Sequence, residues 1–223
     1  MKIALSKVAI LVIAVLCLTQ TYAQAASTLT PPPFKISVEK KLHRLGIPTG
    51  KIDGIFDGQT RRALCVWREL TGAVVNRNLP TGYEYNEIQT TEILFASDQL
   101  EAGLNINLTC QSAVWLQYET STPMTIFKIS SGRATLETTP GHFLVGWSVD
   151  DWYESRRYPD GWMYRPLFFN QGEALHGSES DSMVHSYPAS HGCVRMMQAD
   201  IDTLWASGFG KGSTIHVYGK WIG

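Results

Sequence analysis

Apolar residues recur every three or four positions in three stretches of the first hundred residues, a spacing that predicts helices. The first stretch ends at Gly46, the second runs from near Gln59 to Gly72, and the third covers residues 85–96. Glycine commonly ends a helix because it adopts positive φ without strain. The inward-facing positions are Val38, Leu42 and Leu45, then Ala63, Leu64, Trp67 and Leu70, then Ile88 and Leu94.

From residue 103 onward, short apolar runs rich in β-branched and aromatic residues alternate with turn residues, which is typical of strands. One helix interrupts them, with a shared apolar face and Gly208 at its end. The pattern predicts an α+β fold, with a small three-helix N-terminal domain followed by a β-sandwich-like domain. The predicted strands cover residues 113–118, 124–130, 142–147, 167–170, 174–176 and 214–218, and the helix face is Met197, Ile201, Leu204 and Trp205.

The chain begins like an exported protein. A short basic segment precedes an apolar stretch over residues 8–18, which is too short to span a bilayer comfortably. Ala23 and Ala25 supply the small residues that signal peptidase requires. Residues 1–25 are predicted to be a signal peptide, with an uncleaved anchor as the alternative. The mature chain is then expected to have no transmembrane domain and to lie in the periplasm or cell wall.

Composition narrows the possible functions. Hydrophobic residues make up 44% of the 223 residues and charged residues 17%, which is ordinary for a globular protein. The net charge is -1 and there is no Lys/Arg-rich tract, so nucleic acid is not an expected partner. Three cysteines remain after removal of the signal peptide, and the compartments outside the cytoplasm permit disulfides. Cys65, Cys110 and Cys193 allow three single bridges, each leaving one free thiol.

Reactive residue types concentrate in two segments, His176-Gly177-Ser178 and Ser190-His191-Gly192-Cys193-Val194-Arg195. A cysteine nucleophile acts as thiolate, so its pKa must be lowered by a positive charge or a base. His191 and Arg195 lie two residues on either side of Cys193. Gly192 lets neighbouring amides face a developing oxyanion.

A metal site is the alternative interpretation, because histidine and cysteine are metal ligands. The chain has no Cys-x-x-Cys or His-Glu-x-x-His spacing, so neither a metal nor another cofactor is predicted. The remaining histidines, His43, His142 and His216, are interpreted as structural or surface residues, and His185 as a loop histidine.

Residues 35–75 resemble the peptidoglycan-binding-like domain family, through Leu42-x-x-Leu45-Gly46, Gly50-x-x-Asp53-Gly54-x-Phe56 and Thr60-x-x-Ala63. The domain division expected from this is a proline-rich lead-in over 26–34, the helical domain over 35–75, and a linker with the possible third helix over 76–102. The resemblance implies wall binding. The alternative is a helical cap that binds nothing.

Residues 103–219 resemble the L,D-transpeptidase catalytic domain, with the YkuD-like fold, and the catalytic domain is expected over residues 103–223. The match includes the two reactive segments, Ser131-Gly132, Thr139-Pro140-Gly141-x-Phe143 and the strand Gly212-Ser213-Thr214-Ile215-x-Val217. The resemblance implies Cys193 as nucleophile, His176 as general base and the Gly177 carbonyl as the group that orients His176. It implies an oxyanion site at His191, Gly192 and Cys193.

The same resemblance places other residues around the reaction. Ser190 belongs to the catalytic loop, and Arg195 holds the loop or a substrate carboxylate. Trp162, Tyr164 and Ser178 line the substrate cleft. The aromatic-rich stretch over residues 147–164 is either a lid over the cleft or a loop with its own small core.

The implied reaction is peptidoglycan cross-linking through a Cys193 thioester, from a stem tetrapeptide donor to an amine on an acceptor stem. Water as acceptor makes the enzyme an L,D-carboxypeptidase, and a non-catalytic wall-binding protein is the second alternative. If Cys193 stays reduced, Cys65 and Cys110 are left to form a bridge. That bridge would join the two domains and stabilise the protein by roughly 3–4 kcal/mol.

Overall fold

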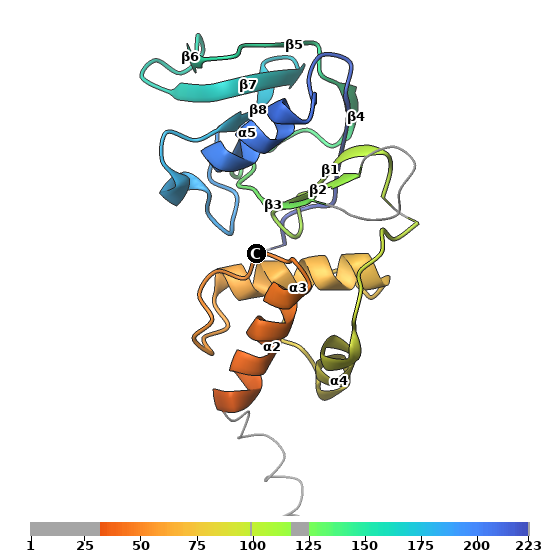
Figure 1. Cartoon of the computed structure of the whole chain (residues 1–223). Coiled ribbons are helices and arrows are strands. Elements are labelled where there is room, and N and C mark those ends of the chain that lie inside the picture. Colours follow the sequence, from red (N-terminus) through yellow and green to blue (C-terminus); the bar gives the residue numbers. More distant parts are fainter. Residues whose placement is uncertain (1–31, 99, 117–124, 223) are drawn as a thin grey trace, which may run out of the picture.

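The structure is a computed structural model that describes residues 32–98, 100–116 and 125–222. The expected signal peptide and the first part of the lead-in lie outside these residues. The described chain forms a helical unit and a β-rich unit stacked on it, and the C-terminal segment returns to the boundary between them (Figure 1). None of the described helices is both long and apolar enough to cross a membrane.

Three helices make the first unit: α2 (Pro32–Arg44), α3 (Gly58–Thr71) and α4 (Gly82–Thr90). The end of the expected lead-in is therefore helical, since proline is tolerated in a first helical turn. The third helix is shorter and earlier than the predicted 85–96. It begins at a capping box formed by Thr81 and Glu84, and the chain after Thr90 is not helical.

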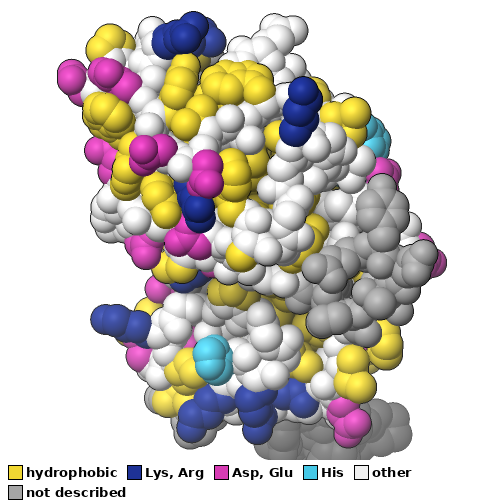
Figure 2. All heavy atoms as spheres, turned by 45° about the horizontal axis from the view of Figure 1, so that its top comes forward, with side chains coloured by type: hydrophobic (Ala, Val, Ile, Leu, Met, Phe, Trp, Pro, Cys, Tyr) yellow, Lys and Arg dark blue, Asp and Glu magenta, His cyan; other side chains and the backbone are white. Residues whose placement is uncertain are grey.

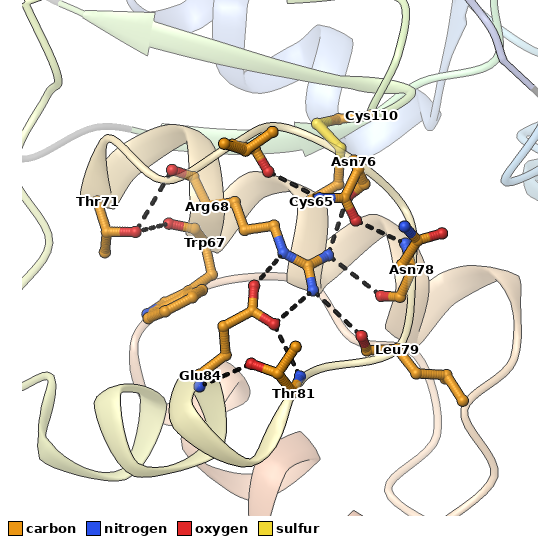
Figure 3. Close-up of polar contacts among 11 residues, drawn as sticks. Cys65, Trp67, Arg68, Thr71, Asn76, Asn78, Leu79, Thr81, Glu84 and Cys110 are labelled. Atoms are coloured by element: carbon orange, nitrogen blue, oxygen red, sulfur yellow. Dashed lines mark hydrogen bonds and ion pairs between the residues drawn. A yellow bond between two sulfur atoms is a disulfide. The ribbon is translucent and has the colours of Figure 1, made fainter.

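Arg68 ties α3 to α4 and to the connection between them (Figure 3). Its guanidinium is 1% exposed and contacts the Glu84 carboxylate, with Nε 2.6 Å from Oε1. It also donates to the carbonyls of Asn76 and Asn78, at 3.0 and 3.1 Å. Because Glu84 also caps α4, one buried cation fixes both the start of that helix and its position against α3.

The β-rich unit contains two sheets and one α-helix. One sheet has the order β3-β2-β1-β10-β4 and the other β5-β7-β8-β9, with β6 paired to β7. The elements are β1 (Gly103–Asn107), β2 (Ser112–Leu116), β3 (Thr125–Lys128), β4 (Gly141–Leu144), β5 (Trp147–Ser148), β6 (Trp152–Glu154), β7 (Trp162–Asn170), β8 (Glu173–Gly177), the 3-10 helix η1 (Asp181–Met183), β9 (Val194–Met196), α5 (Gln198–Ala206) and β10 (Thr214–Tyr218).

One hydrophobic core joins both sheets and α5. Its members include Ile106 from β1, Leu167 from β7, Leu175 from β8 and Leu204 from α5, each fully buried. The predicted α+β class with a sandwich-like second part is confirmed. Strands β1, β6 and β9 were not among the predicted strands. In β1 the apolar pattern is broken by Asn105 and Asn107, which are buried because they bond to neighbouring segments.

The two units share a buried interface. The Cys65–Cys110 disulfide joins α3 to the turn between β1 and β2, as the resemblance implies, with the Cα atoms 5.3 Å apart. Glu69 on α3 accepts hydrogen bonds from Asn107 and from the Tyr218 hydroxyl. Arg62 on α3 donates to the carbonyls of Ile129 and His185. The helical unit therefore contacts the segments that lead to Cys193.

Candidate active site

Cys193 lies directly before β9, beside the start of β8. The two strands are parallel, with His176 paired to Arg195 and Leu175 to Val194. Cys193 is therefore level with Ala174, and His176 lies two residues further along β8, on the same face as Ala174. The side chains of Cys193 and His176 both line one cavity of about 270 Å³, and Cys193 also lines a second cavity of about 440 Å³.

The His176 imidazole is 6% exposed and fixed by one hydrogen bond. Its Nδ1 is 2.9 Å from the Gly177 carbonyl oxygen. Since a carbonyl only accepts, Nδ1 carries the hydrogen and Nε2 keeps its lone pair. Burial, with a smaller effect from the positive charge of Arg195, lowers the His176 pKa to about 4. The imidazole is therefore a neutral base at neutral pH.

The Cys193 thiol is also neutral at rest, which corrects the sequence-based expectation of a lowered pKa. Burial raises its pKa, and the negative charge of Glu173 acts in the same direction. The Ala174 amide and Arg195 oppose this shift but do not reverse it. Removing the thiol from water therefore outweighs the nearby positive charge. The resting pair is therefore a neutral thiol and a neutral imidazole.

A tight turn presents the thiol. Gly192 has φ +117°, a conformation that residues with a Cβ rarely adopt. The Ser190 hydroxyl accepts from the Gly192 amide at 3.1 Å and donates to the Cys193 carbonyl. The Gly192 amide is thus already bonded and is not available to the predicted oxyanion site. Among the described residues, the amides of His191 and Cys193 have no recorded partner.

The turn before Cys193 is anchored to a neighbouring loop through Ser131. The Ser131 carbonyl accepts from the amides of Ala189 and Ser190, at 2.9 and 3.0 Å. Gln111 in turn bonds Ser131 twice, accepting from its amide and donating to its hydroxyl. Gln111 is fully buried, has φ +58° and follows Cys110. Sequence reasoning missed Gln111, and only its position next to a bridged cysteine could have drawn attention to it.

The other predicted site residues occupy both sides of Cys193. Arg195 lines the smaller cavity and donates to the Ala189 carbonyl at 3.4 Å, so it holds the loop. The His191 ring lines both cavities and stacks on Tyr158, with centroids 4.4 Å apart. Ser178 lines the smaller cavity, and its hydroxyl is buried without a hydrogen-bond partner in the described part of the chain.

Two predicted cleft residues have different positions. Trp162 is 43% exposed and lines the smaller cavity. Tyr164 lines neither of these cavities. Its hydroxyl donates to Asp202 on α5 at 3.0 Å, and its ring packs against Gly177, where a Cβ would lie 2.9 Å from it. Tyr164 is therefore a packing residue that explains why position 177 is glycine.

The aromatic-rich stretch over residues 147–164 borders the site and shares a small hydrophobic core with neighbouring segments. Met163, Phe168 and Ala174 are buried together, with Tyr153 and Cys193 packed against them. Hydrophobic side chains also gather on the outer surface over β5 to β7 (Figure 2), where Trp147 is 47% and Trp152 39% exposed. Part of the stretch therefore lines a cavity beside Cys193, and part of it packs into a core shared with residues of β7 and β8.

Comparison with known proteins identifies the β-rich unit. Residues 102–208 match the YkuD family model, the L,D-transpeptidase catalytic domain. This part of the chain is therefore an L,D-transpeptidase catalytic domain, and peptidoglycan is the substrate class that such a domain implies.

Two solved structures are similar over most of their length. An L,D-transpeptidase (residues 123–326) from Xylanimonas cellulosilytica DSM 15894 is 26% identical, with a TM-score of 0.55, and the match covers 82% of this chain and 92% of that chain. An L,D-transpeptidase (Yku) from Stackebrandtia nassauensis is 20% identical, with a TM-score of 0.55 and coverage of 85% and 93%, and shows the shared fold. A comparison with curated proteins found no match.

Proposed function

We propose that the protein is an exported cysteine acyltransferase that cross-links peptidoglycan stem peptides through a thioester on Cys193. The observation that carries this proposal is the shared cavity of Cys193 and His176, with the imidazole oriented by the Gly177 carbonyl. A neutral buried base with a free Nε2 is suited to accept a thiol proton.

The reaction has two halves. In the first, His176 Nε2 takes the thiol proton while Cys193 Sγ attacks the carbonyl of the residue before the terminal D-alanine. The oxyanion is stabilised by free amides of the turn, for which His191 and Cys193 are the candidates. The tetrahedral intermediate then breaks its C–N bond, and His176 returns the proton to the departing amine. This leaves a neutral thioester and free D-alanine.

In the second half an acceptor amine attacks the thioester. Its proton passes to His176, the C–S bond breaks, and the thiolate recovers the proton. Cys193 opens onto cavities of about 440 and 270 Å³, which supports separate places for donor and acceptor. Water as acceptor would give the carboxypeptidase reaction by the same steps. Arg195 and Ser178, which line the smaller cavity, are proposed to contact the peptide there.

The remaining parts of the chain fit an exported wall enzyme. A buried disulfide is typical of proteins outside the cytoplasm, which supports a signal peptide at residues 1–25 and a location in the periplasm or cell wall. The helical region over residues 35–75 is proposed to bind peptidoglycan and, through its buried contacts, to hold the catalytic loop.

Intact mass spectrometry tests the nucleophile. A carbapenem carbonyl acylates a reactive thiol and adds the whole mass of the drug, because the ring opens without losing an atom. The wild type and the Cys65→Ala/Cys110→Ala variant should both gain one adduct, and Cys193→Ala should gain none. A folded wild type with a reduced Cys193 and no adduct would contradict the enzyme and favour the wall-binding alternative.

Product analysis separates the two enzymatic outcomes. With a purified stem tetrapeptide as donor and a second stem as acceptor, a transpeptidase releases D-alanine and forms a cross-linked dimer. A carboxypeptidase releases D-alanine and leaves tripeptide. Dimer in excess of tripeptide is the expected result, and its complete absence in the presence of the acceptor would refute the cross-linking function.

A further inference from the structure

A second cluster of reactive side chains lies outside the active site, where β4 and β10 pair. Glu101, His142 and His216 each offer one ligand-type atom, and these three atoms all lie within 4.8 Å of one another. None of the three residues lines the two cavities beside Cys193. The cluster is therefore separate from the catalytic pair.

The strand register creates the histidine pair. His142 and His216 are direct partners in the antiparallel ladder of β4 and β10, so their side chains project from the same face. Their imidazole rings are stacked, with centroids 4.1 Å apart and planes inclined by 8°. Both ring positions are set by the sheet, which is a more rigid support than a loop.

Glu101 reaches the pair from the segment before β1. Its Oε1 is 2.9 Å from His142 Nε2 and 3.9 Å from His216 Nδ1. The main chain of Glu101 is held on both sides by Asn105, which accepts from its amide at 3.0 Å and donates to its carbonyl at 2.6 Å. Asn105 is 1% exposed, so the carboxylate starts from a backbone position fixed by the sheet.

One nitrogen of the cluster lacks a partner. Nδ1 of His216 is buried and has no hydrogen bond among the described residues. A buried polar atom without a partner is costly, and a bound cation would satisfy it. A cavity of about 210 Å³ opens beside all three side chains.

We propose that Glu101, His142 and His216 bind a zinc ion. Two imidazoles and one carboxylate are a common zinc ligand set, and they leave a fourth position for water. Zinc holds such atoms at about 2.0–2.2 Å, which places them roughly 3.5 Å apart in a tetrahedron. The distances from Glu101 Oε1 to His142 Nε2, 2.9 Å, and to His216 Nδ1, 3.9 Å, lie on either side of that value.

Binding requires the two rings to turn out of their parallel stack so that their lone pairs converge. The side chains of His142 and Glu101 are 65% and 53% exposed and have room for this movement. The ion would then join the segment before β1 to both β4 and β10. Its direct consequence is a more stable β-rich unit, independent of the reaction at Cys193.

Zinc titration of the protein tests the site. The Cys193→Ala background without an affinity tag is used, because a thiol also binds zinc. Calorimetry should show about one zinc bound per chain, and the thermal unfolding midpoint should rise in about 100 µM zinc. His142→Ala and His216→Ala should each weaken binding at least about tenfold, and Glu101→Gln should weaken it while keeping the side-chain shape.

His43→Ala is the matched control, because His43 is an exposed histidine on α2 outside the cluster. It should leave both the affinity and the zinc-dependent shift unchanged. Circular dichroism before titration establishes that each variant is folded. No zinc bound at about 100 µM, or equal binding by His43→Ala and the two cluster variants, would overturn the proposal.

Discussion

Removing the Cys65–Cys110 disulfide is expected to destabilise the protein strongly, and the size of the effect follows from the loop it closes. The two cysteines are 45 residues apart. In the chain-entropy model, opening such a loop restores about 13 cal/mol/K to the unfolded chain, or about 4 kcal/mol at 25 °C. Both side chains are fully buried, so alanine is the suitable replacement because it adds no polar atom.

Urea unfolding measures this loss. The Cys65→Ala/Cys110→Ala variant and its parent are compared in a Cys193→Ala background, which prevents thiol exchange. With a slope of about 2 kcal/mol per molar urea, a loss of about 4 kcal/mol lowers the midpoint by about 2 M. Reductant should bring the parent to nearly the same midpoint. A decrease in the midpoint smaller than about 0.5 M would refute the loop-entropy reasoning.

The same disulfide is expected to influence catalysis. Cys110 precedes Gln111, and Gln111 holds Ser131, whose carbonyl anchors the amides of Ala189 and Ser190. With Cys193 intact, the Cys65→Ala/Cys110→Ala variant should therefore be acylated more slowly than wild type under conditions where both remain folded. Equal acylation rates would show that the loop is held without help from the bridge.

Three individual residues, His176, Gly192 and Glu69, are expected to change activity or stability in measurable ways. Because burial lowers the His176 pKa to about 4, the rate of Cys193 acylation should fall with decreasing pH only near pH 4. A rate that already falls at pH 6–7 would contradict a neutral buried base. Gly192→Ala places a residue with a Cβ at φ +117°, and it should lower the free energy of unfolding by about 1–3 kcal/mol, measured by urea unfolding. It should also slow the acylation of Cys193. An unchanged unfolding free energy and acylation rate would argue against a strained turn. Burial raises the Glu69 pKa, and the hydrogen bonds from Tyr218 and Asn107 only partly oppose this shift. The stabilisation of the folded state by protonated Glu69 is therefore fully present below the unfolded pKa of about 4.5. It is lost as the pH rises through the higher pKa of the folded state. Glu69→Gln should therefore gain stability relative to wild type as pH rises from about 4 to 8, and a pH-independent difference in unfolding free energy would disprove this account.

Local sequence pattern was sufficient for much of the architecture. Helix α3 follows from its apolar spacing and from Gly72, both of which act within one or two turns, and the structure adds Asp57 as its N-cap. The same holds for the turn before Cys193, because the conformational freedom of Gly192 is a property of one residue. Helix α4 was misplaced because its start depends on Thr81 and Glu84, a capping signal outside the apolar pattern.

The electrostatic state of the site could not be predicted in this way. Proximity in sequence suggested that Arg195 would lower the Cys193 pKa, but the packing around the sulfur decides the direction of the shift. Desolvation depends on every neighbouring atom, including those of Phe168 and Ala174 on other strands. The position of Tyr164 away from the cleft also depends on tertiary packing, because its hydroxyl contacts Asp202 on α5.

By itself, the amino-acid sequence determined most of the helices and strands, the Cys193 and His176 segments and the resemblance to a catalytic domain family. These features depend on residue type and on spacing over a few positions. The tertiary structure decided the neutral state of the thiol, the anchoring of its loop by Gln111 and the grouping of Glu101 with His142 and His216. Each of these depends on residues far apart in the chain, and only the folded packing sets their distances and their exclusion from water.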